Sequence, residues 1–324
     1  MIWIIFIAFI LVLLLLDLGV FHKGNHVIST KEATIWTFIW IALSMCFNVL
    51  IYFGYKYHWF GLGETIGHVV TTEAQARGVA LDFFTGYLLE KSLSVDNIFV
   101  IALIFTYFKI QTRYQHRILF WGIIGALVFR SLMIVAGVAL IEKFSWMIIL
   151  LGLFLLYSGY KMIFGGEEEE NIEESFAVRM LKKVVSVNMD APQQLMFYRK
   201  EGKLFITASL LALMVVEITD LLFALDSIPA IISITNDEFI VFTSNIMAIL
   251  GLRSLYFVLA SSLADFKYLK TSLAVILAFV GLKMILHFFH LDIPTPVSLG
   301  FIVLALTAGV YFSVVHNKKE ASKN

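Results

Sequence analysis

Two apolar stretches of the chain contain oxygen-bearing side chains of the kind that bind cations. We predict that the ligands of such a cation are Glu90, Asp96, Asn97, Glu217, Asp220, Asp226 and Ser227. A charge at the bilayer centre costs about 2.5–3.5 kcal/mol, so the five carboxylates left unpaired would cost on the order of 15 kcal/mol together. A bound metal, a proton or a basic partner would each offset that cost. The sequence therefore indicates a functional site inside a membrane.

The donor set indicates a hard divalent cation. Both stretches offer carboxylate, amide and hydroxyl oxygens, and neither contains a His or a Cys. Such donors suit Mg²⁺, Ca²⁺ or Mn²⁺ better than zinc or copper. Lys91, Arg130 and Arg253 cannot act as metal ligands, so we assign them gating or charge balance. The alternative is a set of salt bridges between these bases and the carboxylates, with no metal.

Helical geometry relates the acidic residues of the second stretch. Glu217 and Asp220 are three residues apart and share a helix face. Asp220 and Asp226 lie about 120° apart on a regular helix. Pro229 removes an amide donor and clashes with the carbonyl group of Leu225. We therefore expect a helix break beside Asp226, as in the discontinuous helices that bind ions in transporters.

The elements that carry these residues are expected to be transmembrane helices. Of the 324 residues, 60% are hydrophobic and 15% are charged, and the mean hydropathy is +0.88. A soluble domain is less apolar and more charged. We predict an all-α polytopic membrane protein whose single domain, 1–324, contains about nine transmembrane helices of about 20 residues. The predicted spans are 2–21, 33–54, 80–106, 117–140, 146–164, 203–234, 239–261, 270–289 and 296–315.

Flanking charges predict the orientation of the chain. No Lys or Arg precedes the first apolar stretch, so we expect a retained helix and no cleaved signal. With the N-terminus outside, the cytoplasmic segments hold sixteen Lys and Arg residues and the external ones hold three. This excess predicts a multi-pass protein of the plasma (inner) membrane with a cytoplasmic C-terminus. Segment 165–202 is expected to be a charged cytoplasmic loop with an amphipathic helix near 172–185.

An internal repeat is visible in three matches that occur in the same order. They pair Glu90 and Asp96 with Asp220 and Asp226, Arg130 with Arg253, and Gly159 with Gly281. Each copy contains three helices, so the second copy enters the membrane from the opposite side, as in secondary transporters. We predict inverted repeats over 80–164 and 203–290, with 291–324 forming the last helix and a cytoplasmic tail.

The same residues resemble the signatures of the TerC/Alx family, most closely its Alx branch. The first resemblance lies at 86–97, with the sequence GYLLEKSLSVDN, and the second at 217–231, with EITD followed by FALDSIPAI. Residues 243–245 with 252–253 also fit, and the likeness covers nearly the whole chain. The resemblance implies manganese efflux, because family members are regarded as Mn²⁺ exporters and some assist metal loading of secreted enzymes. It also implies functional roles for Glu90, Asp96, Glu217, Asp220 and Asp226.

We therefore expect an alternating-access exporter and not an enzyme. Mn²⁺ would be its substrate, no cofactor is expected, and protons are the candidate counter-ion because the site is rich in carboxylates. The expected partners are the metal ion, the lipid bilayer and other membrane proteins, with no nucleic acid. The alternative is a membrane scaffold or accessory subunit of a metal-loading complex, with no transport of its own.

Overall fold

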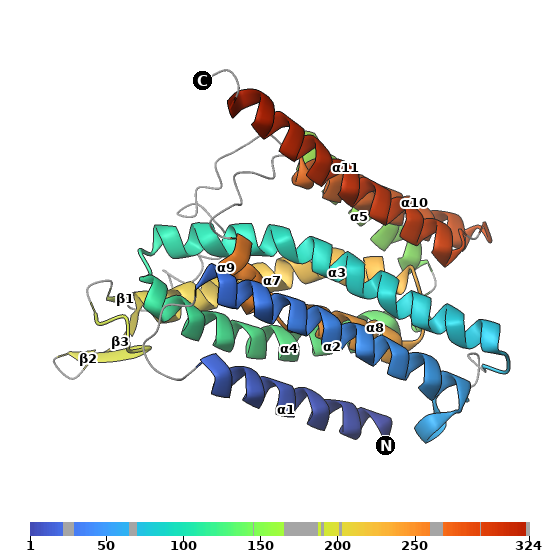
Figure 1. The fold of residues 1–324 in the computed structure, drawn as a ribbon, viewed down its shortest axis with the longest axis horizontal. Helices are drawn as coiled ribbons and strands as arrows, with labels where there is room; N and C mark the ends of the chain where they lie inside the picture. The colour runs from blue at the N-terminus through green and yellow to red at the C-terminus, as the bar shows by residue number, and fades with distance from the viewer. Residues whose placement is uncertain are drawn as a thin grey trace.

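The molecule is a bundle of long helices with a small sheet at one end (Figure 1). The computed structural model describes residues 1–21, 29–64, 70–144, 146–164, 187–188, 191–200, 203–259, 268–291 and 293–321. The predicted amphipathic helix near 172–185 lies outside these residues. Large apolar side chains such as Leu15, Phe38, Leu132 and Leu304 face outward, as expected of a surface solvated by lipid. The fold is that of a polytopic membrane protein.

Helices occupy each of the stretches in which a transmembrane span is predicted. They are α1 (Ile2–Phe21), α2 (Thr30–Lys56), α3 (Glu73–Tyr107), α4 (Thr112–Lys143), α5 (Met147–Phe164), α7 (Ala208–Ile232), α8 (Glu238–Ile249), α9 (Leu252–Leu259), α10 (Leu269–Phe288) and α11 (Thr295–Ala321), with a short 3₁₀ turn η1 (Trp59–Gly61). Within the described ranges, six have the length and apolar composition of a membrane span, or seven if the bent pair α8 and α9 is one span. The apolar part of α1 is shorter, and α3 carries more charge, so for these two helices the span stays a prediction.

A threonine cap and an aspartate cap fix where two central helices begin. The Thr72 hydroxyl accepts a hydrogen bond from the Gln75 backbone amide, and the Thr72 backbone amide donates one to the Gln75 side chain, which forms a capping box before α3. Asp237 accepts bonds from the amides of Phe239 and Ile240 at 3.0 and 3.2 Å and starts α8. These caps satisfy amides that have no partner inside the helix.

A three-stranded sheet precedes α7, where the sequence predicts loop and helix. The strands β1 (Val187–Asn188), β2 (Phe197–Lys200) and β3 (Lys203–Thr207) pair in the order β1-β3-β2. The prediction of a span beginning at 203 is therefore wrong by five residues, because β3 runs to Thr207, whose hydroxyl caps α7. The predicted loop 165–202 likewise contains two strands in its described part. Short apolar runs such as Leu204–Ile206 have the same hydropathy whether they form a strand or a helix.

The helix break lies in a different span from the predicted one. Helix α7 continues through Pro229 to Ile232, so the expected break beside Asp226 does not occur. Proline is tolerated there because it lies in the last turn, close to where the helix ends. The chain instead bends by 43° between α8 and α9, at Gly251. Gly251 has a φ of +80°, and a Cβ atom there would lie 2.7 Å from the Trp40 ring, so only glycine fits.

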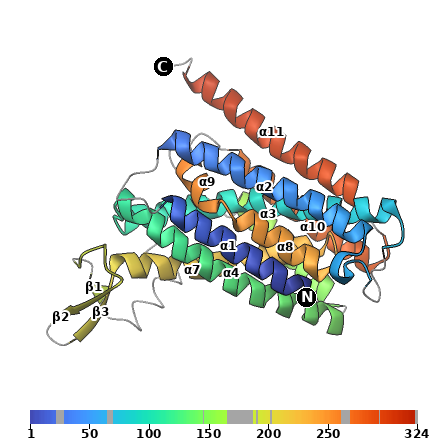
Figure 2. The same ribbon diagram turned by 60° about the horizontal axis from the view of Figure 1, so that its bottom comes forward.

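The packing of the helices brings the two candidate stretches together. Helix α7 packs against α3 and α4, and α8 packs against α3 (Figure 2). Helix α5 packs against α10 (Figure 1). Where α5 crosses α10, a Cβ atom on Gly281 would lie 2.6 Å from the Gly152 carbonyl oxygen. A Cβ atom on Gly159 would lie 2.7 Å from the Ala274 carbonyl oxygen. Small residues therefore let these two backbones touch, which is typical of helix pairs in membranes.

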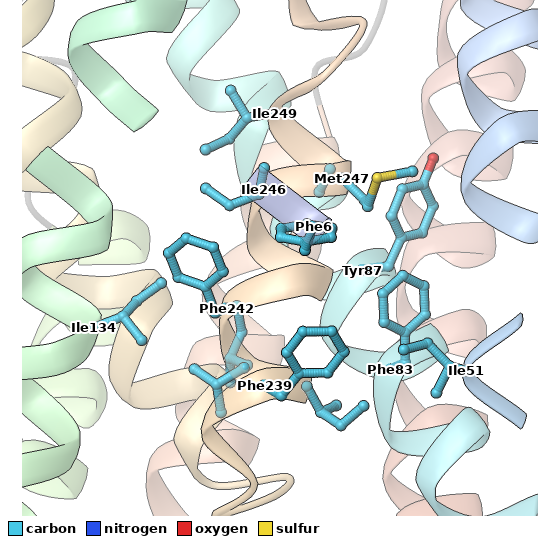
Figure 3. Packing of buried hydrophobic residues seen from close by; sticks show 14 of the residues in the cluster. Phe6, Ile51, Phe83, Tyr87, Ile134, Phe239, Phe242, Ile246, Met247 and Ile249 are labelled. Atoms are coloured by element: carbon cyan, nitrogen blue, oxygen red, sulfur yellow. The ribbon is translucent and has the colours of Figure 1, made fainter. Parts of the chain in front are cut away.

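An aromatic core ties α1 to the buried helix α8. Phe6 of α1 lies 5.9 Å, centroid to centroid, from both Phe239 and Phe242 of α8. Phe83 and Met247 extend this cluster toward α3, and Figure 3 shows these side chains interdigitating. Helix α1 thus packs on the bundle and covers one side of α8. Every residue of α8 from Phe239 to Ile249 is buried.

Candidate functional site

A buried arginine lies at the centre of the polar side chains that α3 and α7 bring together. Arg130, on α4, is 1% exposed. Its Nε donates to Asp220 Oδ2 at 2.9 Å and its Nη2 donates to Asp220 Oδ1 at 2.8 Å. Its Nη1 donates to Glu90 Oε1 and, at 3.4 Å, to Ser227 Oγ. Glu90 and Asp220, predicted to bind one cation from two helices, do converge on one cation, and it is a guanidinium.

Two amide side chains complete this cluster and leave buried oxygens unsatisfied. Asn97 Nδ2 donates to Asp220 Oδ1 at 3.2 Å, and Asn245 Nδ2 donates to Glu90 Oε2 at 3.0 Å. A carboxylate accepts only from the NH₂ group of an amide, so these bonds fix the orientation of both side chains. The Oδ1 atoms of Asn97 and Asn245 consequently have no hydrogen-bond donor among the described residues.

Asn245 was absent from the predicted ligands, although it is fully buried against Glu90. The sequence offers two signals, a lone amide within the apolar stretch 239–261 and the family resemblance at 243–245. A single amide is as consistent with helix–helix hydrogen bonding as with a site, so the signal lacked specificity.

The other predicted ligands do not contact Arg130, or their side chains are not among those that the structure describes. Asp226 accepts a hydrogen bond of 2.7 Å from Ser158 Oγ on α5. Glu217 lies against Gly125 of α4, where a Cβ atom would overlap its carboxylate, and Glu217 Oε2 is buried with no partner in the described part of the chain. Asp96 is part of α3, but its side chain lies outside the described residues.

The Lys91 ammonium group donates hydrogen bonds to backbone carbonyl oxygens at the end of α8. Its Nζ donates to the carbonyl oxygens of Ala248 and Leu250, at 3.1 and 3.3 Å. The break at Gly251 frees these carbonyls from the helix ladder, and the C-terminal end of a helix carries partial negative charge. The ammonium group therefore caps α8, and its predicted role in charge balance or gating beside Glu90 stays a prediction.

Arg253 lies outside the cluster that contains its repeat counterpart, Arg130. It pairs with Asp17 of α1, whose Oδ2 lies 2.7 Å from Arg253 Nη2, and it also donates to the Asp17 carbonyl at 2.9 Å. Both side chains are buried, at 1% and 7% exposure. The sequence could not predict this pair, because α1 lies outside the repeat and its position in the bundle depends on packing.

Two cavities adjoin the cluster. One, of about 30 Å³, is lined by Asn97, Gly122, Thr219 and Asp220 with several apolar side chains. The other, also of about 30 Å³, is lined by polar and apolar groups that include Glu90, Asn97, Arg130, Asp226 and Ser227. Asn97 thus borders both cavities, and the second connects the Arg130 cluster with the separate carboxylate of Asp226.

The arrangement holds the buried carboxylate of Glu90 and the partly buried carboxylate of Asp220 on one internal cation. Glu90, Asp220 and Arg130 carry a formal net charge of −1, so the cluster has spare negative charge beside unsatisfied oxygens. Among the residues that the structure describes, no three His, Cys, Asp or Glu side chains form a metal-binding group. Of the six predicted ligands whose side chains the structure describes, Glu90, Asn97, Asp226 and Ser227 border one cavity together with Arg130, whereas Glu217 and Asp220 do not.

Comparisons with known proteins agree with these features. The family model for the integral membrane protein TerC family matches residues 76–321. An uncharacterized membrane protein of Myxococcus xanthus is 43% identical over 98% of this chain and 92% of its own length. A putative membrane-bound redox modulator Alx of Photorhabdus laumondii is 41% identical over 100% and 98%, and its Escherichia coli counterpart is 42% identical over 88% and 86%. No solved structure gives a significant match. The chain belongs to the TerC family of integral membrane proteins, as its signatures predict.

Proposed function

We propose that the protein exports a divalent metal cation, Mn²⁺ by family resemblance, through the site between α3 and α7. The observation that carries this proposal is the surplus of buried oxygen acceptors around Arg130. Glu90 and Asp220 converge there, and the oxygens Asn97 Oδ1 and Asn245 Oδ1 have no donor in the described part of the chain. Buried acceptors are costly without a donor, and a metal cation would satisfy several at once.

In this proposal Arg130 is the internal counter-ion of the empty site. Glu90 is buried and Asp220 is partly buried, and leaving both carboxylates unpaired would cost several kcal/mol, so a transporter needs a cation there when its substrate is absent. A divalent cation would bind the carboxylates as the guanidinium moves away, which ties occupancy to a rearrangement of α4 against α3 and α7. Substrate binding and conformational change would thereby be coupled.

The packing of the helices supports an inverted-repeat mechanism. In the predicted correspondence α3, α4 and α5 match α7, the α8–α9 pair and α10. Under this correspondence the contact between α3 and α8 in one half-to-half interface is equivalent to the contact between α7 and α4 in the other. Both contacts are extensive. The same correspondence, which pairs Gly159 with Gly281, makes the Gly152–Gly281 approach equivalent to the Gly159–Ala274 approach. Alternating access by rocking of such halves is the usual mechanism of this architecture.

Direction and energy source complete the proposal. The Lys and Arg excess predicts a cytoplasmic C-terminus in the inner membrane, so the ion would enter the site from the cytoplasm and leave on the opposite side. Protons that occupy the carboxylates on the return step would couple export to the proton gradient. The alternative of a scaffold subunit predicts no flux of metal at all.

The test is the manganese content of cells with and without the protein. The wild-type protein should lower cellular manganese and raise tolerance to added Mn²⁺, and Asp220→Asn should abolish both effects while still inserting in the membrane. Glu238→Gln is the matched control, because Glu238 is an exposed carboxylate at the start of α8. Manganese content that is the same with and without the protein would favour the scaffold function, and wild-type activity in Asp220→Asn would contradict the role of this site.

A further inference from the structure

The second cavity is lined by several side chains with oxygen atoms that could bind a metal and by one with a sulfur atom. Its lining combines oxygens from Glu90, Asn97, Asp226 and Ser227 with the side chain of Met162. We propose that the Met162 thioether is a ligand that makes the transported cation a transition metal in preference to Mg²⁺ or Ca²⁺. The inference rests on the proposed function and names the substrate class of the same site.

Met162 is held beside the acidic residues by the helix that carries it. It lies in the last turn of α5, four residues after Ser158, and residues four apart share one helix face. The Ser158 hydroxyl holds Asp226 at 2.7 Å, so this face of α5 is turned toward α7. The thioether and the Asp226 carboxylate therefore border the same space.

The chemistry of the donors gives Met162 its proposed role. Carboxylate, amide and hydroxyl oxygens bind Mg²⁺, Ca²⁺ and Mn²⁺ alike, whereas a thioether favours softer metals. Mg²⁺ and Ca²⁺ are abundant in cells, so a site made only of oxygens would be occupied by them. One soft donor among hard ones gives a divalent transition metal an advantage that oxygen ligands alone cannot supply.

Its repeat counterpart shows what a packing methionine looks like in this fold. Met284, which aligns with Met162 in the sequence, is 2% exposed in a cluster with Leu155, Ile276 and Leu277. It borders neither of the two cavities beside Arg130. Met162 is partly buried and also packs against this cluster, but it borders the second cavity and Met284 does not, so Met284 provides the matched control.

The experiment measures cation selectivity in proteoliposomes. Flux of Mn²⁺ and Cd²⁺ is compared with flux of Mg²⁺ and Ca²⁺ for wild type, Met162→Leu, Met162→Gln and Met284→Leu. Leucine is close to methionine in volume, so packing is largely kept. We expect Met162→Leu to lower the preference for Cd²⁺ over Mg²⁺ by about tenfold, and Met162→Gln to lower it further by adding a hard oxygen. Met284→Leu should match the wild type.

The outcomes separate this inference from the function on which it rests. Wild-type selectivity in both Met162 variants would overturn the role of the thioether while leaving the transporter intact. An equal loss of selectivity in Met284→Leu would overturn it too, because the effect would then come from packing. A wild-type protein that moves none of the four ions would overturn the proposed function, and this inference with it.

Discussion

Arg130 and Asp220 form a bidentate pair, with hydrogen bonds of 2.9 Å from Nε and 2.8 Å from Nη2 to the two carboxylate oxygens. This planar geometry is specific to arginine, since a lysine provides only a point charge. The pair joins α4 to α7, and the bond from Nη1 to Glu90 adds α3. One side chain therefore holds the three helices that surround the candidate site.

Arg130→Met is expected to destabilise the protein by about 3–5 kcal/mol, because it leaves the buried carboxylate of Glu90 and the partly buried one of Asp220 without a counter-ion. Thermal unfolding in detergent measures this loss. Mn²⁺ should then raise the unfolding temperature of the variant more than that of the wild type, since the metal would replace the missing charge. Arg77→Met, at an exposed pair with Glu73, is the control and should cost little. No added stabilisation by Mn²⁺ would argue against cation binding between Glu90 and Asp220.

Lys91→Met is expected to cost about 1–3 kcal/mol, because it leaves the carbonyls of Ala248 and Leu250 buried without a donor. The bend at Gly251 should loosen, which hydrogen exchange of the amides in α9 would detect. Lys270→Met removes an exposed ammonium group and serves as the control. Unchanged exchange in Lys91→Met would mean that the lysine does not cap α8.

Gly281→Ala is expected to destabilise the protein by about 1–3 kcal/mol, the usual cost of overpacking. The added Cβ atom would lie 2.6 Å from the Gly152 carbonyl oxygen, so α10 and α5 must separate. Gly300→Ala on α11 is the control, because nothing lies within 4 Å of its new methyl group. If the two variants unfold at the same temperature, the close crossing of α5 and α10 is not a determinant of stability.

Much of the helical framework could be predicted because membrane-spanning helices appear in the sequence as long apolar runs. The position of Glu90 on α3 and of Asp220 on α7 followed from those runs, and so did the packing of these helices around one cation. The sequence could not show that Arg130 supplies that cation, because its partners depend on how α4 crosses α3 and α7. The same is true of Asp17 and Arg253, which lie 236 residues apart.

The errors have local causes. Strand β3 and helix α7 form one continuous apolar run, so hydropathy could not separate them at Thr207. Pro229 is a weaker determinant than its type suggests, because it lies where α7 is about to end. Gly251 is a stronger determinant of helix geometry than Pro229, since its positive φ and its contact with Trp40 impose a bend. The neighbouring residue pattern does not predict this bend.

Proton coupling predicts that an imposed pH gradient alters metal flux. In vesicles that contain Mn²⁺ at their cytoplasmic face, acidifying the opposite side should speed Mn²⁺ movement toward it, because returning protons would reset the carboxylates. An ionophore that collapses the proton gradient is the control and should remove the increase. Flux that is the same at every gradient would exclude protons as the counter-ion and leave the metal site untouched.

The central claim is that Glu90 and Asp220 together carry a divalent cation across the membrane. Its most direct test is Mn²⁺ flux into proteoliposomes of purified protein, measured for wild type, Glu90→Gln, Asp220→Asn and the exposed-site control Glu238→Gln. We predict saturable flux for wild type and control, and flux at the level of protein-free liposomes for both site variants with intact folding. Equal flux in all four proteins, or none in the wild type, would contradict the account.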